Sequence, residues 1–268
     1  MPKLSAEPGQ WSGRDVSVVI PVKDDWFVLA RCLKSIRQFS PEAEIVVVDN
    51  DSRQPCPLEV SCLADVLIHF SGSLRACRFE GARRASRPIL MCIDADQVML
   101  PGTVMAAVHA LGRADAVVIP ERPLERQGFF HWLLERERAL TEWAGLGVPR
   151  VTLRTGYVLL TPPMSEVLFG DDREAFSRYR SVAISTVAIL HDEVPSFASL
   201  MKKYARYGSA LNGTPLRRRL IGVRKVRHGR GSTLTAADAV SVPLVLALKA
   251  CKLVALQWGA VRGQRHTQ

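Results

Sequence analysis

This sequence lacks the features of a secreted or disulfide-bonded protein. Its six cysteines include no CxxC pair and do not cluster with histidines. Several lie inside apolar runs, where a reduced thiol behaves as a small hydrophobic side chain. The first 13 residues contain no apolar core of signal-peptide length, which argues against secretion. We therefore expect a protein of a reducing, cytoplasmic compartment.

Long uncharged apolar runs are also missing. No run of about 18 apolar residues without a charge is present, so we expect no helix that spans a bilayer. Residues 241–259 predict a terminal helix that is too short and too charged to span, with Lys249 and Lys252 on one face. Such a helix either packs on the domain or lies in a membrane interface. The second alternative predicts a peripheral contact with the inner face of the membrane through residues 240–260.

Acidic residues are scarce in one part of the chain. Residues 194–268 hold 14 Lys and Arg but a single acid, Asp238, whereas residues 1–193 hold 22 Lys and Arg and 25 acids. This imbalance predicts contact with an anionic partner, unless the segment is simply a solvated basic tail. No RNA-binding signature accompanies the basic run from Lys202 to Arg230. We therefore expect no nucleic acid, and favour an anionic or lipid-linked acceptor or an anionic bilayer.

Short β-branched runs alternate with helical patterns over the first 120 residues. Strands are expected at 16–20, 44–49, 64–70, 89–94 and 116–120, and helices at 26–39, 76–86 and 103–113. Continuous Val and Ile runs suit strands that are covered on both faces, and the alternation predicts a doubly wound α/β domain. Further on, we expect a helix at 129–145, a strand at 157–163, and helices at 171–180 and 196–211 around the apolar stretch 182–190.

Acid pairs follow three of these expected strands. They are Asp24 and Asp25, Asp49 and Asp51, and Asp94 and Asp96. Ligands of open α/β sheets bind at the carboxyl ends of the strands, where one acid can also cap a helix. Three acidic sets at one place would repel each other without a compensating cation. Mg²⁺ is typically held by one or two carboxylates together with substrate phosphates, so Asp94 and Asp96 predict a divalent cation that binds a diphosphate.

Three ordered stretches together resemble the family 2 glycosyltransferases. They are "VSVVIPVKDDWFVLARCLKSI", "EIVVVDNDS" and "ACRFEGARRASRPILMCIDADQVMLPGTV", and the resemblance extends from residue 16 to about residue 210. It implies a GT-A type, Rossmann-like doubly wound sheet with helices on both faces, to which the charge and apolar pattern of the last residues add a basic C-terminal helical extension. It also implies a metal-dependent, inverting glycosyltransferase of the hexosyltransferase type (EC 2.4) that uses a nucleotide-diphosphate sugar, with a UDP-sugar favoured.

The resemblance also implies roles for individual residues. It assigns the nucleotide-sugar site to Pro21, Val22, Lys23, Asp24, Asp49, Arg78, Asp94, Ala95 and Asp96. It assigns the Mg²⁺ or Mn²⁺ ion to Asp96 with Asp94, and to His191, since some related enzymes place a histidine in this region on the metal. Phe79 and Arg87 depart from the asparagine and glycine that are usual in the family.

The general base of an inverting transfer is expected in "FGDDREAFSRYR". Two acids at a helix start are also favoured by capping and by the helix dipole. The resemblance places the base at Asp172, with Asp171 as the alternative. The Q-x-x-R-W motif of processive polysaccharide synthases is absent, which favours transfer of a single sugar.

These features divide the chain into four segments. We expect an N-terminal tail at 1–14, a nucleotide-sugar-binding half at 15–120, an acceptor-binding half with the base at 121–211, and a basic helical extension at 212–268. One alternative is a nucleotidyltransferase, but "PVKDDW" lacks the glycine-rich loop expected after the first strand. Another is a basic nucleic-acid-binding protein, which leaves the strand-end acids unexplained. A Rossmann dehydrogenase is excluded because no G-x-G-x-x-G follows the first strand.

Overall fold

A seven-stranded sheet organises the computed structural model, which describes residues 11–125, 128–144, 147–160, 179–184, 186–192, 196–209 and 235–265. In spatial order its strands are β3 (Val66–His69), β2 (Glu44–Asp49), β1 (Val16–Val22), β4 (Ile89–Cys92), β8 (Val151–Leu153), β6 (Ala116–Val118) and β9 (Ser181–Ala183). The pairs are parallel except those of β8, which runs antiparallel to both β4 and β6. The expected doubly wound sheet is thus confirmed as a mixed, mostly parallel one.

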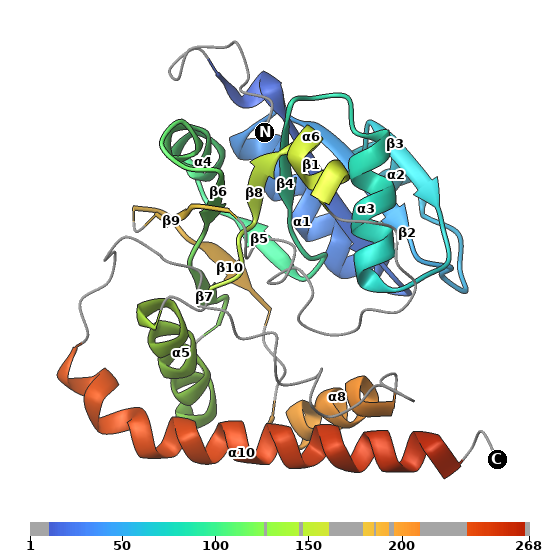
Figure 1. Cartoon of the computed structure of the whole chain (residues 1–268). Helices are drawn as coiled ribbons and strands as arrows, with labels where there is room; N and C mark the ends of the chain where they lie inside the picture. Colours follow the sequence, from blue (N-terminus) through green and yellow to red (C-terminus); the bar gives the residue numbers. More distant parts are fainter. Residues whose placement is uncertain are drawn as a thin grey trace.

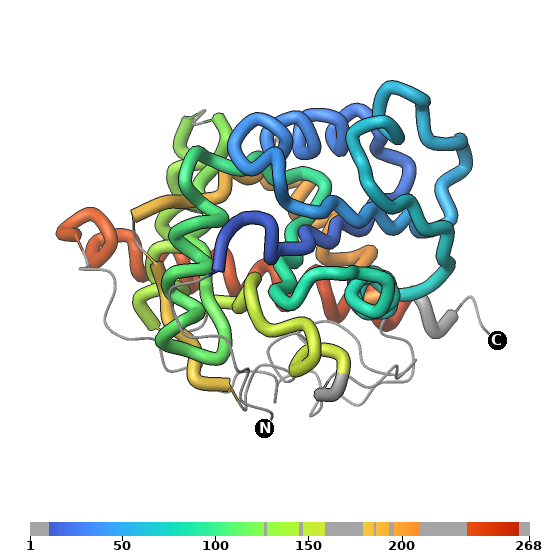
Figure 2. Tube along the Cα trace, turned by 90° about the horizontal axis from the view of Figure 1, so that it is seen from above, coloured from blue at the N-terminus to red at the C-terminus, as the bar shows by residue number. Residues whose placement is uncertain are grey.

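Helices cover both faces of this sheet, which explains its uninterrupted apolar strands. Alternate residues of β1, such as Val18 and Ile20, face a core that includes α1 (Trp26–Phe39), α2 (Leu58–Ser61) and α4 (Thr103–Leu111). Val19 faces the opposite core, with α3 (Leu74–Arg84) and α6 (Arg154–Leu160). Figure 2 shows α1 and α3 on opposite sides of the strands. This two-sided burial is the arrangement that continuous Val and Ile runs predict.

The first helix shows how the local sequence sets the element. The carboxylate of Asp25 accepts a hydrogen bond from the backbone N–H of Val28 and caps the helix. Leu29, Leu33 and Ile36 recur at helical spacing and are fully buried. This cap and this spacing confirm the helix expected at 26–39.

A 3₁₀ turn, η1 (Gly13–Asp15), precedes β1 and is capped by Ser12.

A second, three-stranded sheet extends from the first. Its order is β5 (Gln97–Met99), β10 (Ile189–His191) and β7 (Glu121–Pro123). In its register Gln97 and Pro123 both lie opposite His191. Residues that are nearly 100 positions apart in the sequence are thereby brought next to the end of β4.

Three helices form a layer apart from the sheets. Figure 1 shows α10 (Ala236–Arg265) running past α5 (Gly128–Trp143) and α8 (Phe197–Ser209). Leu133 and Leu134 of α5, Leu200 of α8 and Val245 and Leu248 of α10 share one apolar cluster. The expected helices at 129–145 and 196–211 are thus confirmed to within a few residues.

The first four residues of the strand expected at 157–163 are helical. Tyr157 to Leu160 belong to α6, and the strand of this region, β8, lies earlier at Val151–Leu153. Tyr157 is 2% exposed and packs with Val19 and Val46 on the sheet. A short apolar run does not distinguish a strand from a buried helical turn, because both bury every residue. Residues 161–163, and 171–178 of the next expected helix, lie outside the described residues.

The terminal helix is longer than the sequence led us to expect. It has 30 residues, with Pro243 inside it, and among the described residues it is one helix long and apolar enough to cross a membrane by length and composition. The expectation of a helix too short and too charged to span was wrong. Its regular turns extend beyond 241–259 on both sides, and Lys249 and Lys252 are the only charges between Asp238 and Arg262. Length and composition alone do not place the helix in a membrane.

Candidate active site

The carboxyl ends of β1, β2 and β4 lie side by side, because β1 pairs with both of the others. Pro21 and Val22 end β1, and Val22 lies opposite Asp49, the last residue of β2. Asp49 is buried, and its carboxylate accepts hydrogen bonds from the backbone N–H of Ser52 at 3.0 Å and pairs with His69 Nδ1 at 3.0 Å. The acids that follow these strands are thus placed at one edge, as the sheet rule predicts.

Asp24 joins the loops that follow β1 and β2. It has a φ of 59°, in the left-handed region. Its carboxylate accepts hydrogen bonds from the backbone N–H and from Nε of Arg53, at 2.7 and 3.2 Å. The backbone hydrogen bond from Arg53 is the main reason that the pKa of Asp24 is lowered. Lys23 beside it is exposed. The two loops therefore form one connected rim.

Asp94 is held by two arginines. Arg78 of α3 donates to its Oδ1, and Nη1 of Arg150 lies 3.3 Å from its Oδ2. Burial alone would raise the pKa of Asp94, but the positive charges of Arg78 and Arg150 outweigh it and hold that pKa well below its usual value. Arg78 of α3 and Asp94, two residues after β4, are therefore held together as an ion pair.

Glu121 completes this charged cluster. Arg150 Nη2 donates to its Oε1, and Arg138 lies 3.4 Å from its Oε2. Burial opposes its ionisation, but Arg150 and Arg138 lower the pKa of Glu121 to about 2. Gln97 connects the two acids, because it accepts from the backbone N–H of Asp94 and donates to Glu121. Sequence analysis missed Glu121 and Arg150; the only signal was their position next to apolar runs.

Asp96 lies at the junction of the two sheets. Its Oδ2 is 3.5 Å from Nε2 of His191, and its backbone oxygen accepts from the N–H of Asp192 at 2.8 Å. Asp192 in turn forms a 2.6 Å ion pair with Arg31 of α1. The other carboxylate oxygen, Oδ1, is buried and has no hydrogen-bond partner among the described residues. Burial is the main reason that the pKa of Asp96 is raised and that the pKa of His191 is lowered.

Asp96 and His191 fit a divalent cation. A buried carboxylate oxygen without a partner is costly, and a coordinated cation would satisfy it. The neutral imidazole that a lowered pKa favours is the form in which histidine binds metals. Both oxygens of Asp94 are instead engaged by guanidinium groups. The described residues include no group of three or more metal-ligating side chains, so other oxygens, such as those of a diphosphate, are needed to complete a coordination shell.

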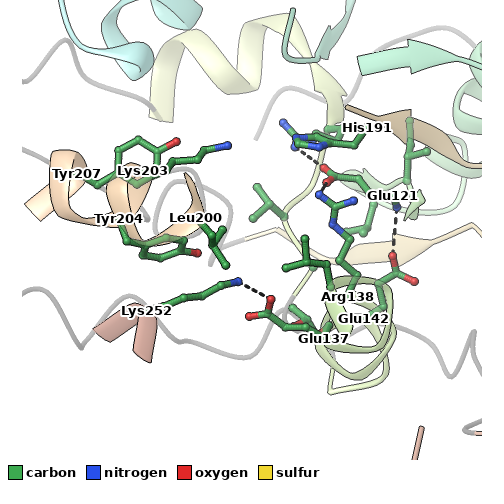
Figure 3. Close-up of a pocket in the computed structure, with 17 residues that line it drawn as sticks. Glu121, Glu137, Arg138, Glu142, His191, Leu200, Lys203, Tyr204, Tyr207 and Lys252 are labelled. Atoms are coloured by element: carbon green, nitrogen blue, oxygen red, sulfur yellow. Dashed lines mark hydrogen bonds and ion pairs between the residues drawn. The ribbon is translucent and has the colours of Figure 1, made fainter. Parts of the chain in front are cut away.

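A cavity of about 400 Å³ opens beside His191 and Glu121. Figure 3 shows that α8 contributes Lys203, Tyr204 and Tyr207 to its wall. The ammonium group of Lys203 points toward His191 in this view, and its charge acts on both Asp96 and His191. The described residues give Lys203 no ion-pair partner. The cavity therefore joins the acidic sheet end to a partly basic wall.

The structure does not place every residue that sequence analysis assigned to the site. It brings Arg78, Asp94, Ala95, Asp96 and His191 to one end of the sheets, with Asp49 at the end of β2 and Asp24 on the loop after β1 beside them. Asp171 and Asp172, the expected base and its alternative, lie outside the described residues.

Solved structures of nucleotide-sugar enzymes have similar folds. The mannosyltransferase PcManGT from Pyrobaculum calidifontis, in complex with GDP-Man and Mn²⁺, has a TM-score of 0.55 at 16% identity over 95% of this chain and 88% of that one. Residues 1–349 of S. aureus TarS give 0.53 at 13% identity, over 95% and 92%. The Mycobacterium tuberculosis glucosyl-3-phosphoglycerate synthase, with Mn²⁺ and UDP, gives 0.52 at 17% identity, over 77% and 80%. At these identities the likeness shows the fold.

Sequence comparison identifies the family. A search of curated proteins found no match. The family model described as "Glycosyl transferase family 2" matches residues 17–172, which is more than half of the chain and includes the strand-end acids at positions 24, 49, 94 and 96. This protein therefore belongs to glycosyl transferase family 2, with the GT-A fold, and is an enzyme that transfers a sugar from a nucleotide-sugar donor.

Proposed function

We propose that this enzyme transfers a single sugar from a UDP-sugar to an acceptor hydroxyl with inversion, and that Asp96 and His191 hold a Mn²⁺ or Mg²⁺ ion for that purpose. The observation that carries the proposal is that Oδ1 of Asp96 is buried without a hydrogen-bond partner in the described part of the chain, while its Oδ2 lies 3.5 Å from Nε2 of His191. Two of the three similar structures hold Mn²⁺, which supports the choice of a divalent cation.

The donor is proposed to lie along the edge formed by β1, β2 and β4. Asp24, on the loop after β1, and Asp49, at the end of β2, are suited to the nucleoside, and Arg78 with Asp94 to the ribose or the donor sugar. UDP is proposed as the nucleotide, because the synthase from Mycobacterium tuberculosis was solved with UDP and TarS with UDP-GlcNAc. The diphosphate would then reach Asp96, where its oxygens can complete the coordination shell.

The chemistry needs a base and a stabilised leaving group. The acceptor oxygen attacks the anomeric carbon, its proton passes to Asp172 as general base, and the bond from that carbon to the diphosphate oxygen breaks. The cation, when bound, stabilises negative charge on the departing diphosphate. Lys203, whose ammonium points toward His191, is placed to neutralise part of the same charge. Its position on the cavity wall also favours an acceptor that carries negative charge.

Thermal unfolding with nucleotides tests this proposal. UDP with Mn²⁺ should raise the unfolding temperature by several degrees, since a ligand present at about 100 times its Kd stabilises the native state by about 2.7 kcal/mol. UDP with EDTA should give a much smaller rise, and GDP with Mn²⁺ a smaller rise than UDP with Mn²⁺. A rise that is the same with Mn²⁺ and with EDTA would contradict the metal site, and a larger rise with GDP would contradict the choice of nucleotide.

Asp172→Asn should remove turnover and leave donor binding intact. The amide cannot accept the acceptor proton, so we expect kcat to fall by about a hundredfold or more, while the stabilisation by UDP and Mn²⁺ stays at the wild-type value. Sugar-nucleotide turnover, measured as UDP release, checks the first point. Asp171→Asn is the matched control, because it removes the same charge one residue away. If only Asp171→Asn is inactive, the base is Asp171.

A further inference from the structure

The terminal helix is apolar on the side that faces away from the protein as well as on the side that packs. Val245, Leu248 and Ala260 are buried against the domain. On the opposite side, large apolar side chains are between 42% and 76% exposed: Val240, Leu244, Leu246, Leu253, Val254, Trp258 and Val261. A helix that is apolar all round is normally buried or in contact with lipid. Only 22% of the most apolar stretch of this helix is buried, so the described residues leave a large part of its apolar surface uncovered.

Specific contacts fix which side of the helix is exposed. Lys252 forms an ion pair with Glu137 of α5, and Arg136 pairs with Asp238 at 2.8 Å. Against α8 the backbones approach closely, because a Cβ on Gly208 would lie 1.8 Å from the carbonyl oxygen of Leu256. A Cβ on Gly259 would likewise lie 1.8 Å from the carbonyl oxygen of Ala205. The helix therefore cannot turn its exposed apolar side inward without losing both ion pairs and this close packing.

The part of the sequence that carries the apolar surface is strongly basic. Residues 194–268 carry 14 Lys and Arg and one acid, and that acid, Asp238, is buried. Lys249 and Arg262 are exposed on the helix. The guanidinium carbon of Arg262 lies 3.8 Å from the ring centroid of Trp258, which is 51% exposed. Tryptophan and arginine at the edge of an apolar surface are typical of the boundary between headgroups and acyl chains.

We propose that the exposed side of α10 lies flat in the surface of an anionic phospholipid bilayer. The apolar side chains would enter the acyl boundary, while the basic groups contact the headgroups. A spanning orientation would place Lys249 and Lys252 in hydrocarbon and would separate Lys252 from Glu137 of α5, which is costly. A second copy of the chain is disfavoured as the partner, because the contact would bring two basic segments together.

Vesicle sedimentation of the full chain tests this proposal. The protein should pellet with vesicles of phosphatidylcholine and phosphatidylglycerol, much less with phosphatidylcholine alone, and less at high salt. The triple variant Leu246→Gln, Leu253→Gln, Val254→Gln should reduce partitioning about tenfold or more, with the unfolding temperature unchanged because these side chains are exposed. The matched control Leu58→Gln, Leu74→Gln, Met105→Gln changes three exposed apolar residues elsewhere and should bind as the wild type.

Four outcomes would overturn the proposal. The first is a wild-type protein that stays in the supernatant with anionic vesicles. The second is a triple variant that pellets as well as the control. The third is a protein that remains with the vesicles after an alkaline carbonate wash, which would indicate a spanning helix. A wild-type dimer that the triple variant converts to a monomer, without vesicle binding by either, would identify a second copy as the partner. The assay needs neither donor nor metal, so it fails or succeeds independently of the proposed transfer reaction.

Discussion

Asp96→Asn should abolish the stabilisation by Mn²⁺ and UDP while leaving the unliganded protein at least as stable as the wild type. Burial raises the pKa of Asp96, and its Oδ1 has no hydrogen-bond partner among the described residues. The carboxylate is therefore a desolvated charge that the apoprotein does not need. A neutral amide removes that charge, but it also removes the strongest proposed ligand of the cation. The two effects have opposite signs, and one melting experiment with and without ligand measures both.

The control for this variant is Asp115→Asn. Asp115 accepts a hydrogen bond from the backbone N–H of Arg180, away from the strand-end acids. The Asp115→Asn variant therefore loses one negative charge without a change at the proposed cation site, and its stabilisation by UDP and Mn²⁺ should match that of the wild type. An Asp96→Asn protein that keeps the full response would show that the cation, if one binds, is held by other residues.

The positions of the acids at the ends of β1, β2 and β4 could be predicted, because the patterns that determine them are local in the sequence. Asp24, Asp49 and Asp94 each lie at or just after the end of a largely apolar strand. The parallel pairing of these strands then puts their carboxyl ends at one edge of the sheet. The helices between the strands have a regular apolar spacing, as in α1. Both signals lie within short windows, so neither needs knowledge of the tertiary structure.

The rest of the site depends on contacts between distant segments. Glu121, Arg138 and Arg150 form one charged cluster only because β7, α5 and the residues before β8 converge on the end of β4. No local period marks such residues, since the three-residue strands β5, β7 and β10 are too short to show one. His191 could be suggested from the sequence, but its 3.5 Å approach to Asp96 follows from the pairing of β10 with β5. The same limit applies to α10, whose packing partners decide which apolar side stays exposed.

Arg150→Met should destabilise the protein by about 3 kcal/mol, since removing one partner of a buried ion pair leaves uncompensated charge. The guanidinium group of Arg150 forms ion pairs with the carboxylates of both Asp94 and Glu121, and its side chain is only 11% exposed. Methionine fills similar space but leaves the two carboxylates with fewer cations. For a chain of this size the loss corresponds to a fall of roughly 6–12 °C in Tm. Arg122→Met is the matched control: Arg122 meets Glu142 at 3.5 Å and is 37% exposed, so its loss should cost less than about 1 kcal/mol.

The pH dependence of unfolding, measured for the wild type and for Arg150→Met, separates an electrostatic role of Arg150 from a packing role. The pKa of Glu121 is lowered to about 2 in the folded protein, below its value of about 4.3 in an unfolded chain. A lowered carboxyl pKa stabilises the fold above the unfolded value, and this contribution is lost as the pH falls from about 4.3 through 2. The stability difference between wild type and Arg150→Met should therefore be largest near neutral pH and shrink in that acidic range. A difference that stays constant from neutral pH to pH 3 would mean that Arg150 acts through packing alone.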